Sequence, residues 1–145
     1  MEYLDTNIII YAIQNHPEFG KSCGRILEEV ESGKLKVCSS MLVLVETINV
    51  LTKINKILKK DEKEELVIED NINAILSLPI TWFDLNFLVI KKATEYKYNI
   101  SGVDYVHIAT MELNSIKKVI SLDRELDRVD FVKRVDPTKE EIEEN

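Results

Sequence analysis

The sequence predicts an α/β protein with a mainly parallel, five-stranded central sheet flanked by helices. Short apolar runs alternate along the chain with longer segments whose apolar residues recur at helical spacing, a pattern typical of strands connected by helices. With 145 residues, 45% of them hydrophobic, the chain is long enough for one core and too short for two. Because Asp136-Pro137 disfavours further regular structure, we expect one domain over residues 1–136 and a loose acidic tail over 137–145.

Five short apolar runs are the candidate strands. The run with the sequence VISL is the most clearly apolar, which predicts that its strand is buried. The five runs are Glu2–Leu4, Leu35–Cys38, Ile80–Phe83, Val119–Leu122 and Phe131–Val135.

The first two predicted helices follow from apolar spacing and from capping residues. Lys21–Ser32 repeats apolar residues at helical spacing and is followed by Gly33, a typical C-terminal cap. The hydroxyls of Ser39 and Ser40 can cap the next helix, over residues 41–58. The first half of this helix is so apolar that we expect protein to surround it.

The next two helices are predicted from acidic residues that precede apolar segments. Asp61, with Glu64 three residues later, is typical of a capping box and predicts a helix that ends near Ser77. Asp84 is the expected N-cap of a helix over Leu85–Tyr98.

Composition excludes several classes of protein. The formal net charge of −7 disfavours a protein that coats DNA, although a local basic patch can exist on an acidic chain. Cys23 and Cys38 are too few for a disulfide framework, which favours buried thiols in a reducing compartment. No apolar run is long enough to span a bilayer, and the first residues do not resemble a signal peptide. We expect a cytoplasmic protein without a membrane partner.

Four acidic residues occupy unusual places. Asp5 and Asp123 follow the ends of predicted parallel strands, where ligands bind in open α/β sheets. Glu46 is the only charged residue between Ser40 and Thr52, and it lies along the apolar stripe of its helix.

The fourth acid, Asp104, stands in the first turn of a helix predicted over Val103–Leu113, which Ser101 or Gly102 begins. Each acid has a simpler interpretation, since Asp5 and Asp104 can cap helices. Similarly, Asp123 can cap the short RELDR turn, and Glu46 needs only a buried partner, although no Lys or Arg lies within one turn of it. Because α/β topology can bring all four to one end of the sheet, we favour a single site.

Clustered carboxylates have a definite chemistry. Two of them about 4 Å apart repel by about 4 kcal/mol at an effective dielectric constant near 20, so a cluster must either protonate or bind cations. Ligands that offer only oxygen select hard ions, which predicts Mg²⁺ or Mn²⁺. Such ions can activate water and stabilise the charge that develops on a phosphodiester during hydrolysis.

On these residues the chain resembles the PIN-domain family of metal-dependent nucleases, in particular the short VapC-type ribonuclease toxins of prokaryotes. The resemblance covers nearly the whole chain, through YLDTNII, SSMLVLVETINVL, YNISGVDYVHIA and VISLDRELDRV. No single motif is specific, but the ordered set of four acids is. The family's acids match Asp5, Glu46, Asp104 and Asp123.

The resemblance implies a PIN-like sheet in the order 3-2-1-4-5 and a site that cleaves RNA with Mg²⁺ or Mn²⁺. The four acids would be its catalytic metal ligands, and Thr6 and Ser121 match hydroxyls that help to hold water on the metal. The resemblance also implies a homodimer and inhibition by a small antitoxin, as in type II toxin–antitoxin pairs. Two alternatives stay open: a housekeeping RNA-processing nuclease, and a catalytically idle PIN fold that serves as a binding module.

The chain departs from the family pattern at Tyr105, where a small residue is usual, and at Leu126, where Phe is common. The fourth acid is also the least regular in the family, so Asp127 is a reserve candidate for Asp123. His107 is more simply interpreted as a helix-surface or packed histidine than as a substrate contact.

Lysines on the second half of the Glu46 helix are candidate contacts for RNA phosphates. Of these, Lys53 and Lys56 are the nearest to Glu46 in sequence. Exposed lysines also occur simply as solubilising residues.

Overall fold

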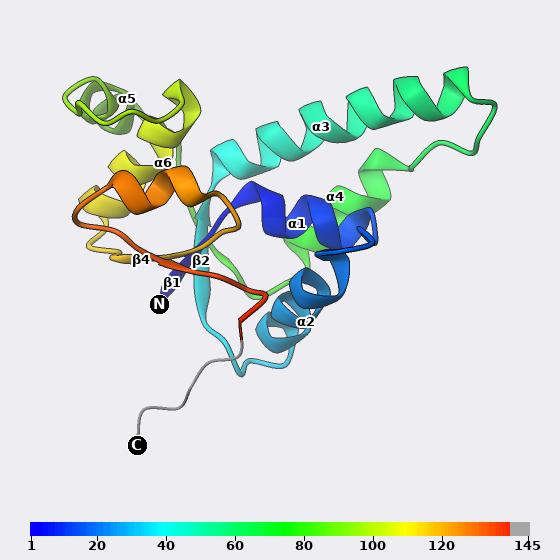
Figure 1. The fold of residues 1–145 in the computed structure, drawn as a ribbon, viewed down its shortest axis with the longest axis horizontal. Helices are drawn as coiled ribbons and strands as arrows, with labels where there is room; N and C mark the ends of the chain where they lie inside the picture. Colours follow the sequence, from blue (N-terminus) through cyan, green and yellow to red (C-terminus); the bar gives the residue numbers. More distant parts are fainter. Residues whose placement is uncertain (140–145) are drawn as a thin grey trace.

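A parallel sheet of five strands lies at the centre of the structure, a computed structural model that describes residues 1–139 (Figure 1). The strands follow the order β3-β2-β1-β4-β5, and every neighbouring pair is parallel. The α/β class, the parallel sheet and the implied order 3-2-1-4-5 are therefore confirmed. The strands are β1 (Glu2–Leu4), β2 (Val37–Ser40), β3 (Thr81–Phe83), β4 (Lys118–Ile120) and β5 (Lys133–Val135).

Helices cover both faces of the sheet. They are α1 (Thr6–Ile13), α2 (Gly20–Glu31), α3 (Met41–Lys60), α4 (Ile68–Leu76), α5 (Phe87–Ala93), α6 (Gly102–Leu113) and the 3₁₀ helix η1 (Arg124–Arg128). Successive strand residues point to opposite faces, so Leu4 and Ile120 pack with α1, α2, α3 and α4. Tyr3 and Val119 pack on the other face with α6 and η1, and α5 packs on α6 (Figure 1).

Capping residues begin three helices as the sequence predicted. Asp5 is the N-cap of α1, with its carboxylate accepting a hydrogen bond from the backbone N–H of Thr6 at 2.8 Å. Similarly, Ser40 caps α3 and Ser101 caps α6 through their hydroxyl oxygens. Gly33 follows α2 with a φ of 78°, a left-handed conformation that glycine adopts without strain. The sequence indicated that Asp5 could cap a helix, but the helix α1 itself was not predicted.

The capping box predicted at Asp61 and Glu64 is wrong. The helix α3 continues to Lys60 and Asp61 is its C-cap, so α4 begins only at Ile68. The chain reverses at Glu62, whose φ of 55° lies in the left-handed region. An acid with another acid three residues later therefore marks here the end of one helix and not the start of the next.

The helix expected over 85–98 is shorter than predicted. Asn86, not Asp84, caps α5, with its side-chain oxygen accepting from the backbone N–H of Val89 at 3.0 Å. The helix ends at Ala93, and strand bounds also differ slightly, as in β2, where residues 35–38 had been expected.

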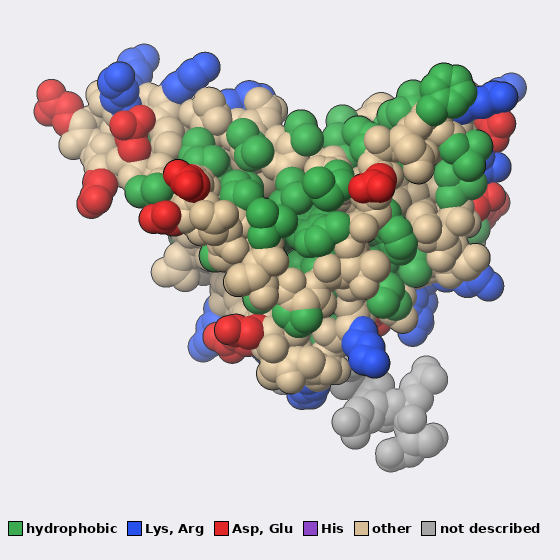
Figure 2. Space-filling view, turned by 180° about the vertical axis from the view of Figure 1, so that it is seen from behind, with side chains coloured by type: hydrophobic (Ala, Val, Ile, Leu, Met, Phe, Trp, Pro, Cys, Tyr) green, Lys and Arg blue, Asp and Glu red, His purple; other side chains and the backbone are tan. Residues whose placement is uncertain are grey.

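The first half of α3 is not surrounded by protein, contrary to the prediction from its apolar sequence. Val43, Leu44 and Leu51 are buried, but Met41 and Val45 on the opposite side are exposed. Figure 2 shows hydrophobic side chains gathered across one face of the molecule. The exposed hydrophobic residues of α3 and of the segment around α5 are Met41, Val45, Ile48, Ile57, Leu85, Phe87, Leu88 and Ile90.

Both cysteines are buried free thiols, as predicted, and burial raises the pKa of each to about 11. Among residues 1–139, no helix combines the length and the apolar character needed to cross a membrane. The acidic tail predicted over 137–145 lies mostly outside the described residues, so its looseness stays a prediction.

Candidate active site

All four predicted acids line one cleft of about 410 Å³. Asp5 follows β1, and Asp123 follows the adjacent strand β4 as the N-cap of η1. Glu46 lies on α3, which follows β2, and Asp104 lies in the first turn of α6. The cleft therefore opens beyond the carboxyl ends of β1 and its neighbours, where the strand order reverses and where α/β sheets bind ligands.

Asp5 is held by three donors. The backbone N–H of Thr6 donates to Oδ1 at 2.8 Å, the Ser121 hydroxyl donates to Oδ2 at 2.6 Å, and the Asn7 amide donates to Oδ2 at 3.3 Å. Burial raises the pKa of this carboxyl above its usual range, although the charge of His107 and the hydrogen bonds from Ser121 and Thr6 oppose the shift. The carboxylate is thus fixed and desolvated, which favours binding of a compensating charge.

Asn7 is a site residue that the sequence reasoning missed. Its amide also donates to the Ser121 hydroxyl at 3.1 Å, and its carbonyl accepts from the backbone N–H of Leu122 at 3.3 Å. The residue therefore ties the start of α1 to the segment after β4. Its position directly after Asp5-Thr6 was the available signal, but only the fold shows what the amide reaches.

Glu46 accepts two hydrogen bonds on one oxygen. Thr6 Oγ1 donates to Oε1 at 3.0 Å, and His107 Nε2 lies 2.5 Å from the same atom. His107 is buried, which agrees with a packed histidine and not with one on the helix surface, and it supplies the buried partner that the simpler interpretation of Glu46 required. Burial lowers the pKa of this histidine, but the hydrogen bond to Glu46 and the charge of Asp5 outweigh that effect and raise it.

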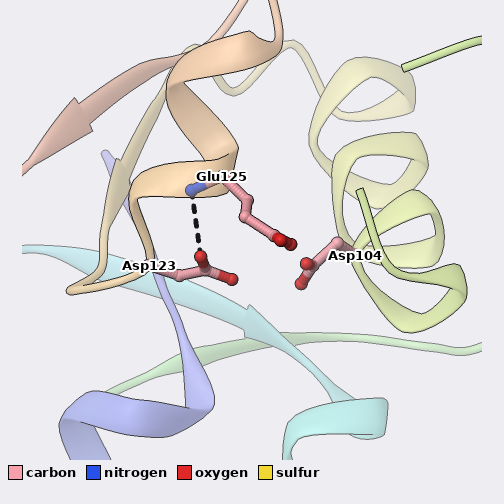
Figure 3. Close-up of side chains that lie close together, drawn as sticks. All are labelled: Asp104, Asp123 and Glu125. Carbon is pink, nitrogen blue, oxygen red and sulfur yellow. Dashed lines mark hydrogen bonds between the residues drawn. The ribbon is translucent and has the colours of Figure 1, made fainter. Parts of the chain in front are cut away.

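Asp104 and Asp123 lie beside a third acid, Glu125, on η1 (Figure 3). One carboxylate oxygen from each lies within 4.8 Å of the others, and Asp123 also accepts the backbone N–H of Glu125 at 3.0 Å. Burial raises the pKa of Asp104 to about 6, and the negative charges of Asp5 and Asp123 add to the shift.

Glu125 was missed because the sequence analysis considered the RELDR segment only as a short turn that Asp123 can cap. It follows Asp123 by two residues, and the tight turn of η1 brings the two carboxylates to one side. Asp127, the reserve acid, does not line the cleft and instead pairs with Arg134 through two hydrogen bonds of 3.0 and 3.1 Å. The structure therefore favours Asp123 over Asp127 as the acid nearest to Asp104.

The two departures from the family pattern turn away from the cleft. Tyr105 stacks on Tyr96 with ring centroids 6.4 Å apart, and its hydroxyl donates to the backbone carbonyl of Tyr98. Leu126 is buried in the core between α6 and β4. Neither side chain lines the cleft.

The two lysines predicted to contact phosphate, Lys53 and Lys56, are exposed on α3 beyond the cleft. Lys53 follows Glu46 by two helical turns, and Val50 on the intervening turn lines the cleft. Their contact with RNA stays a prediction.

The donor set fits a hard divalent cation. Every candidate ligand is a carboxylate oxygen, the donor that Mg²⁺ and Mn²⁺ prefer. Within residues 1–139, His107 is the only basic side chain that forms an ion pair with any of the four cleft acids. The negative charge of the cleft is therefore poorly compensated by the protein itself.

These features define the class of the protein, an open parallel α/β fold with an acidic cleft at the reversal of its strand order. The chain belongs to the PIN domain family, since the family's model matches residues 3–132. This result confirms the resemblance drawn from the four ordered acids.

Solved structures similar to this chain have the same fold over nearly its whole length. VapBC2 from Rickettsia felis, bound to a DNA fragment from its promoter, is 20% identical with a TM-score of 0.67, covering 93% of this chain and 98% of that chain. VapC20 from Mycobacterium tuberculosis, a toxin that cleaves the sarcin-ricin loop, is 19% identical with a TM-score of 0.67, covering 91% and 97%. A toxin-antitoxin complex from Klebsiella pneumoniae is 16% identical with a TM-score of 0.63, covering 94% and 98%.

None of the curated proteins compared with this sequence matches it.

Proposed function

We propose that this protein is an endoribonuclease that depends on Mg²⁺ or Mn²⁺ and acts as the toxin of a type II toxin–antitoxin pair. The observation that carries the proposal is the convergence of Asp5, Glu46, Asp104 and Asp123 on one cleft of a PIN domain. Largely uncompensated carboxylates repel one another, and a bound cation would relieve this repulsion.

Each part of the cleft has a role in this proposal. A bound divalent cation would lower the pKa of water and stabilise negative charge on the scissile phosphodiester. Asp5, Glu46, Asp104 and Asp123 would hold the cation, and Glu125 extends the acidic cluster toward solvent. Thr6, Asn7 and Ser121 donate hydrogen bonds to Asp5 or Glu46 and thereby fix the directions of these ligands.

RNA phosphates would lie along the exposed lysines of α3, because the cleft itself is acidic. Lys53 and Lys56 are the proposed contacts, and both stand on the turns of α3 that follow Glu46.

The toxin role is supported by the solved structures. The structure from Klebsiella pneumoniae is a toxin-antitoxin complex, and VapC20 is a toxin that cleaves the sarcin-ricin loop. We accordingly propose an antitoxin partner encoded beside this protein. A homodimer would cover the apolar side chains exposed on α3 and around α5, such as Val45 and Phe87. A housekeeping nuclease would have no antitoxin gene as its neighbour.

Cleavage of single-stranded RNA tests the enzyme proposal. We expect the wild-type protein to cut a labelled RNA with Mn²⁺ or Mg²⁺ and to lose this activity in EDTA. Glu46→Gln should reduce the rate about a hundredfold or more, because it removes the charge of one ligand and weakens the acceptor of His107. The matched control is Asp127→Asn, which removes a charge from the neighbouring ion pair and should cut like the wild type.

Cleavage that persists in EDTA or in Glu46→Gln would contradict the mechanism. A wild-type protein that binds Mn²⁺ but cuts no RNA in the absence of antitoxin would instead favour the idle binding module.

A further inference from the structure

A chain of hydrogen bonds leads from the core to Glu46. The hydroxyl of Tyr3 lies 2.5 Å from His107 Nδ1, and His107 Nε2 lies 2.5 Å from Glu46 Oε1. Tyr3 is fully buried and His107 is 4% exposed, so water has almost no access to either ring. The sequence alone indicated for His107 only a helix-surface or packed histidine, and it gave Tyr3 no role beyond the strand.

The chemistry of the groups determines which atom donates in the hydrogen bond between His107 and Glu46. An ionised carboxylate only accepts hydrogen bonds, so Nε2 must carry the proton that points to Glu46. In the neutral ring Nδ1 is then an acceptor, and the Tyr3 hydroxyl donates to it. In the charged ring both nitrogens donate, and the Tyr3 oxygen accepts. In either state the Tyr3 hydroxyl satisfies Nδ1 while Nε2–H faces Glu46.

The two donors to Glu46 meet the same oxygen. Thr6 and His107 both reach Oε1, and no hydrogen bond from the described residues reaches Oε2. Glu46 is therefore fixed through one oxygen while the other keeps its lone pairs for a ligand. A glutamate on a helix is otherwise free to rotate about three side-chain bonds, so two donors on one atom restrict it strongly.

Tyr3 and His107 come from the same two parts of the chain as Asp5 and Asp104. Tyr3 lies on β1, and Asp5 directly follows that strand in an extended conformation, so the alternation of side chains places both on one side of the sheet. His107 follows Asp104 by three residues on α6, so both lie on one face of that helix. The hydrogen-bonded chain thus ties Glu46 of α3 to the elements that carry Asp5 and Asp104.

We propose that His107, held in place by Tyr3, is a positioning residue that orients Glu46 Oε2 for the divalent cation. The inference rests on the proposed function, because it assigns a supporting role within the same metal site. Supports of this kind commonly change the affinity of a site for its metal about tenfold or more when they are removed.

The test compares Tyr3→Phe, His107→Leu and His107→Gln in the full chain. Tyr3→Phe removes only the hydroxyl, and Tyr98→Phe is its matched control, since that hydroxyl contacts Asp130 away from the cleft. His107→Leu removes the donor to Glu46, whereas the amide of His107→Gln can still donate. Thermal melting identifies variants that fail to fold.

Titration calorimetry with Mn²⁺ alone gives the first measurement. We expect affinity about tenfold weaker in His107→Leu, about threefold weaker in Tyr3→Phe, partly recovered in His107→Gln and unchanged in Tyr98→Phe. Folded His107→Leu that binds Mn²⁺ as tightly as the wild type would overturn the positioning role.

Nitrogen-15 NMR of the His107 ring gives a second measurement that needs neither metal nor RNA. We expect a protonated Nε2 in the wild type whose proton exchanges slowly with water, and faster exchange in Tyr3→Phe. An unprotonated Nε2, or exchange that Tyr3→Phe leaves unchanged, would overturn the proposal. The two failures are distinguishable: a wild-type protein that binds no Mn²⁺ contradicts the proposed function, whereas equal binding by the wild type and His107→Leu contradicts the positioning role.

Discussion

Asp5→Asn is expected to lower the rate of RNA cleavage about a thousandfold while the protein stays folded. Loss of a metal ligand removes several kcal/mol of transition-state stabilisation, and about 4 kcal/mol corresponds to this factor. The fold should survive, because the side-chain oxygen of Asn can still accept the Thr6 backbone N–H that Asp5 Oδ1 accepts now. The amide nitrogen of Asn would face the Ser121 hydroxyl and the Asn7 amide, which both donate to Asp5 Oδ2 now, so these two contacts should weaken while the helix cap is kept.

The measurement is cleavage of labelled single-stranded RNA at saturating Mn²⁺, with circular dichroism to confirm the fold. Asp127→Asn removes a carboxylate that lies outside the cleft and is the control. An Asp5→Asn protein that keeps a tenth or more of the wild-type rate would contradict the role of Asp5 as a ligand.

Asp104→Asn is expected to stabilise the metal-free protein at pH 7.5 while it weakens cation binding. The pKa of Asp104 is raised to about 6, so its ionised form is unfavourable in the folded protein. A raised acid pKa means that the folded state binds the proton more tightly than the unfolded chain does. The free energy of unfolding therefore falls as the pH rises from about 4 to about 6, and ionised Asp104 costs stability above that range.

The neutral amide of Asp104→Asn removes this cost. We expect a gain of about 1 kcal/mol at pH 7.5, after allowance for screening and for the loss of an acid at the start of α6. Such a gain raises the melting temperature by a few degrees in a chain of this size. The difference should shrink at pH 5, where wild-type Asp104 is largely protonated.

Thermal melts in EDTA at both pH values measure this effect. Addition of Mn²⁺ should raise the melting temperature of the wild type and leave that of Asp104→Asn nearly unchanged, because only binding to the folded state stabilises it. A variant that melts below the wild type at pH 7.5 in EDTA would indicate that Asp104 serves the fold and not a cation.

Much of the fold and of the site could be predicted because each signal is local. The four acids stand out by their immediate neighbours, since Glu46 interrupts an apolar stripe and Asp5 ends an apolar strand. N-caps such as Ser40 and Ser101 bind backbone groups only two or three residues away. The resemblance to the PIN family added the strand order, which local patterns do not encode.

The rest depends on contacts between residues far apart in sequence. His107 meets Glu46 and Tyr3 only because α6, α3 and β1 converge, and Asn7 reaches Ser121 only because β1 and β4 are neighbouring strands. The exposed face of α3 was mispredicted because an apolar pattern measures hydrophobicity and not coverage by other chain segments.

The predicted bounds of two helices were wrong for a related reason. Asp61 could stand at the start of one helix or at the end of another, and because α3 continues to Lys60, it stands at the end of α3. At α5, both Asp84 and Asn86 are competent caps, and the path of the chain after β3 selects the second.

The most direct test of the acidic cleft as a cation site is anomalous X-ray scattering from crystals soaked in Mn²⁺. We predict a manganese peak inside the cleft, within direct coordinating distance of carboxylates from among Asp5, Glu46, Asp104 and Asp123. Glu46 should coordinate through Oε2 while Oε1 keeps its contacts with Thr6 and His107. An empty cleft, or manganese bound only to acids outside it, would contradict the account.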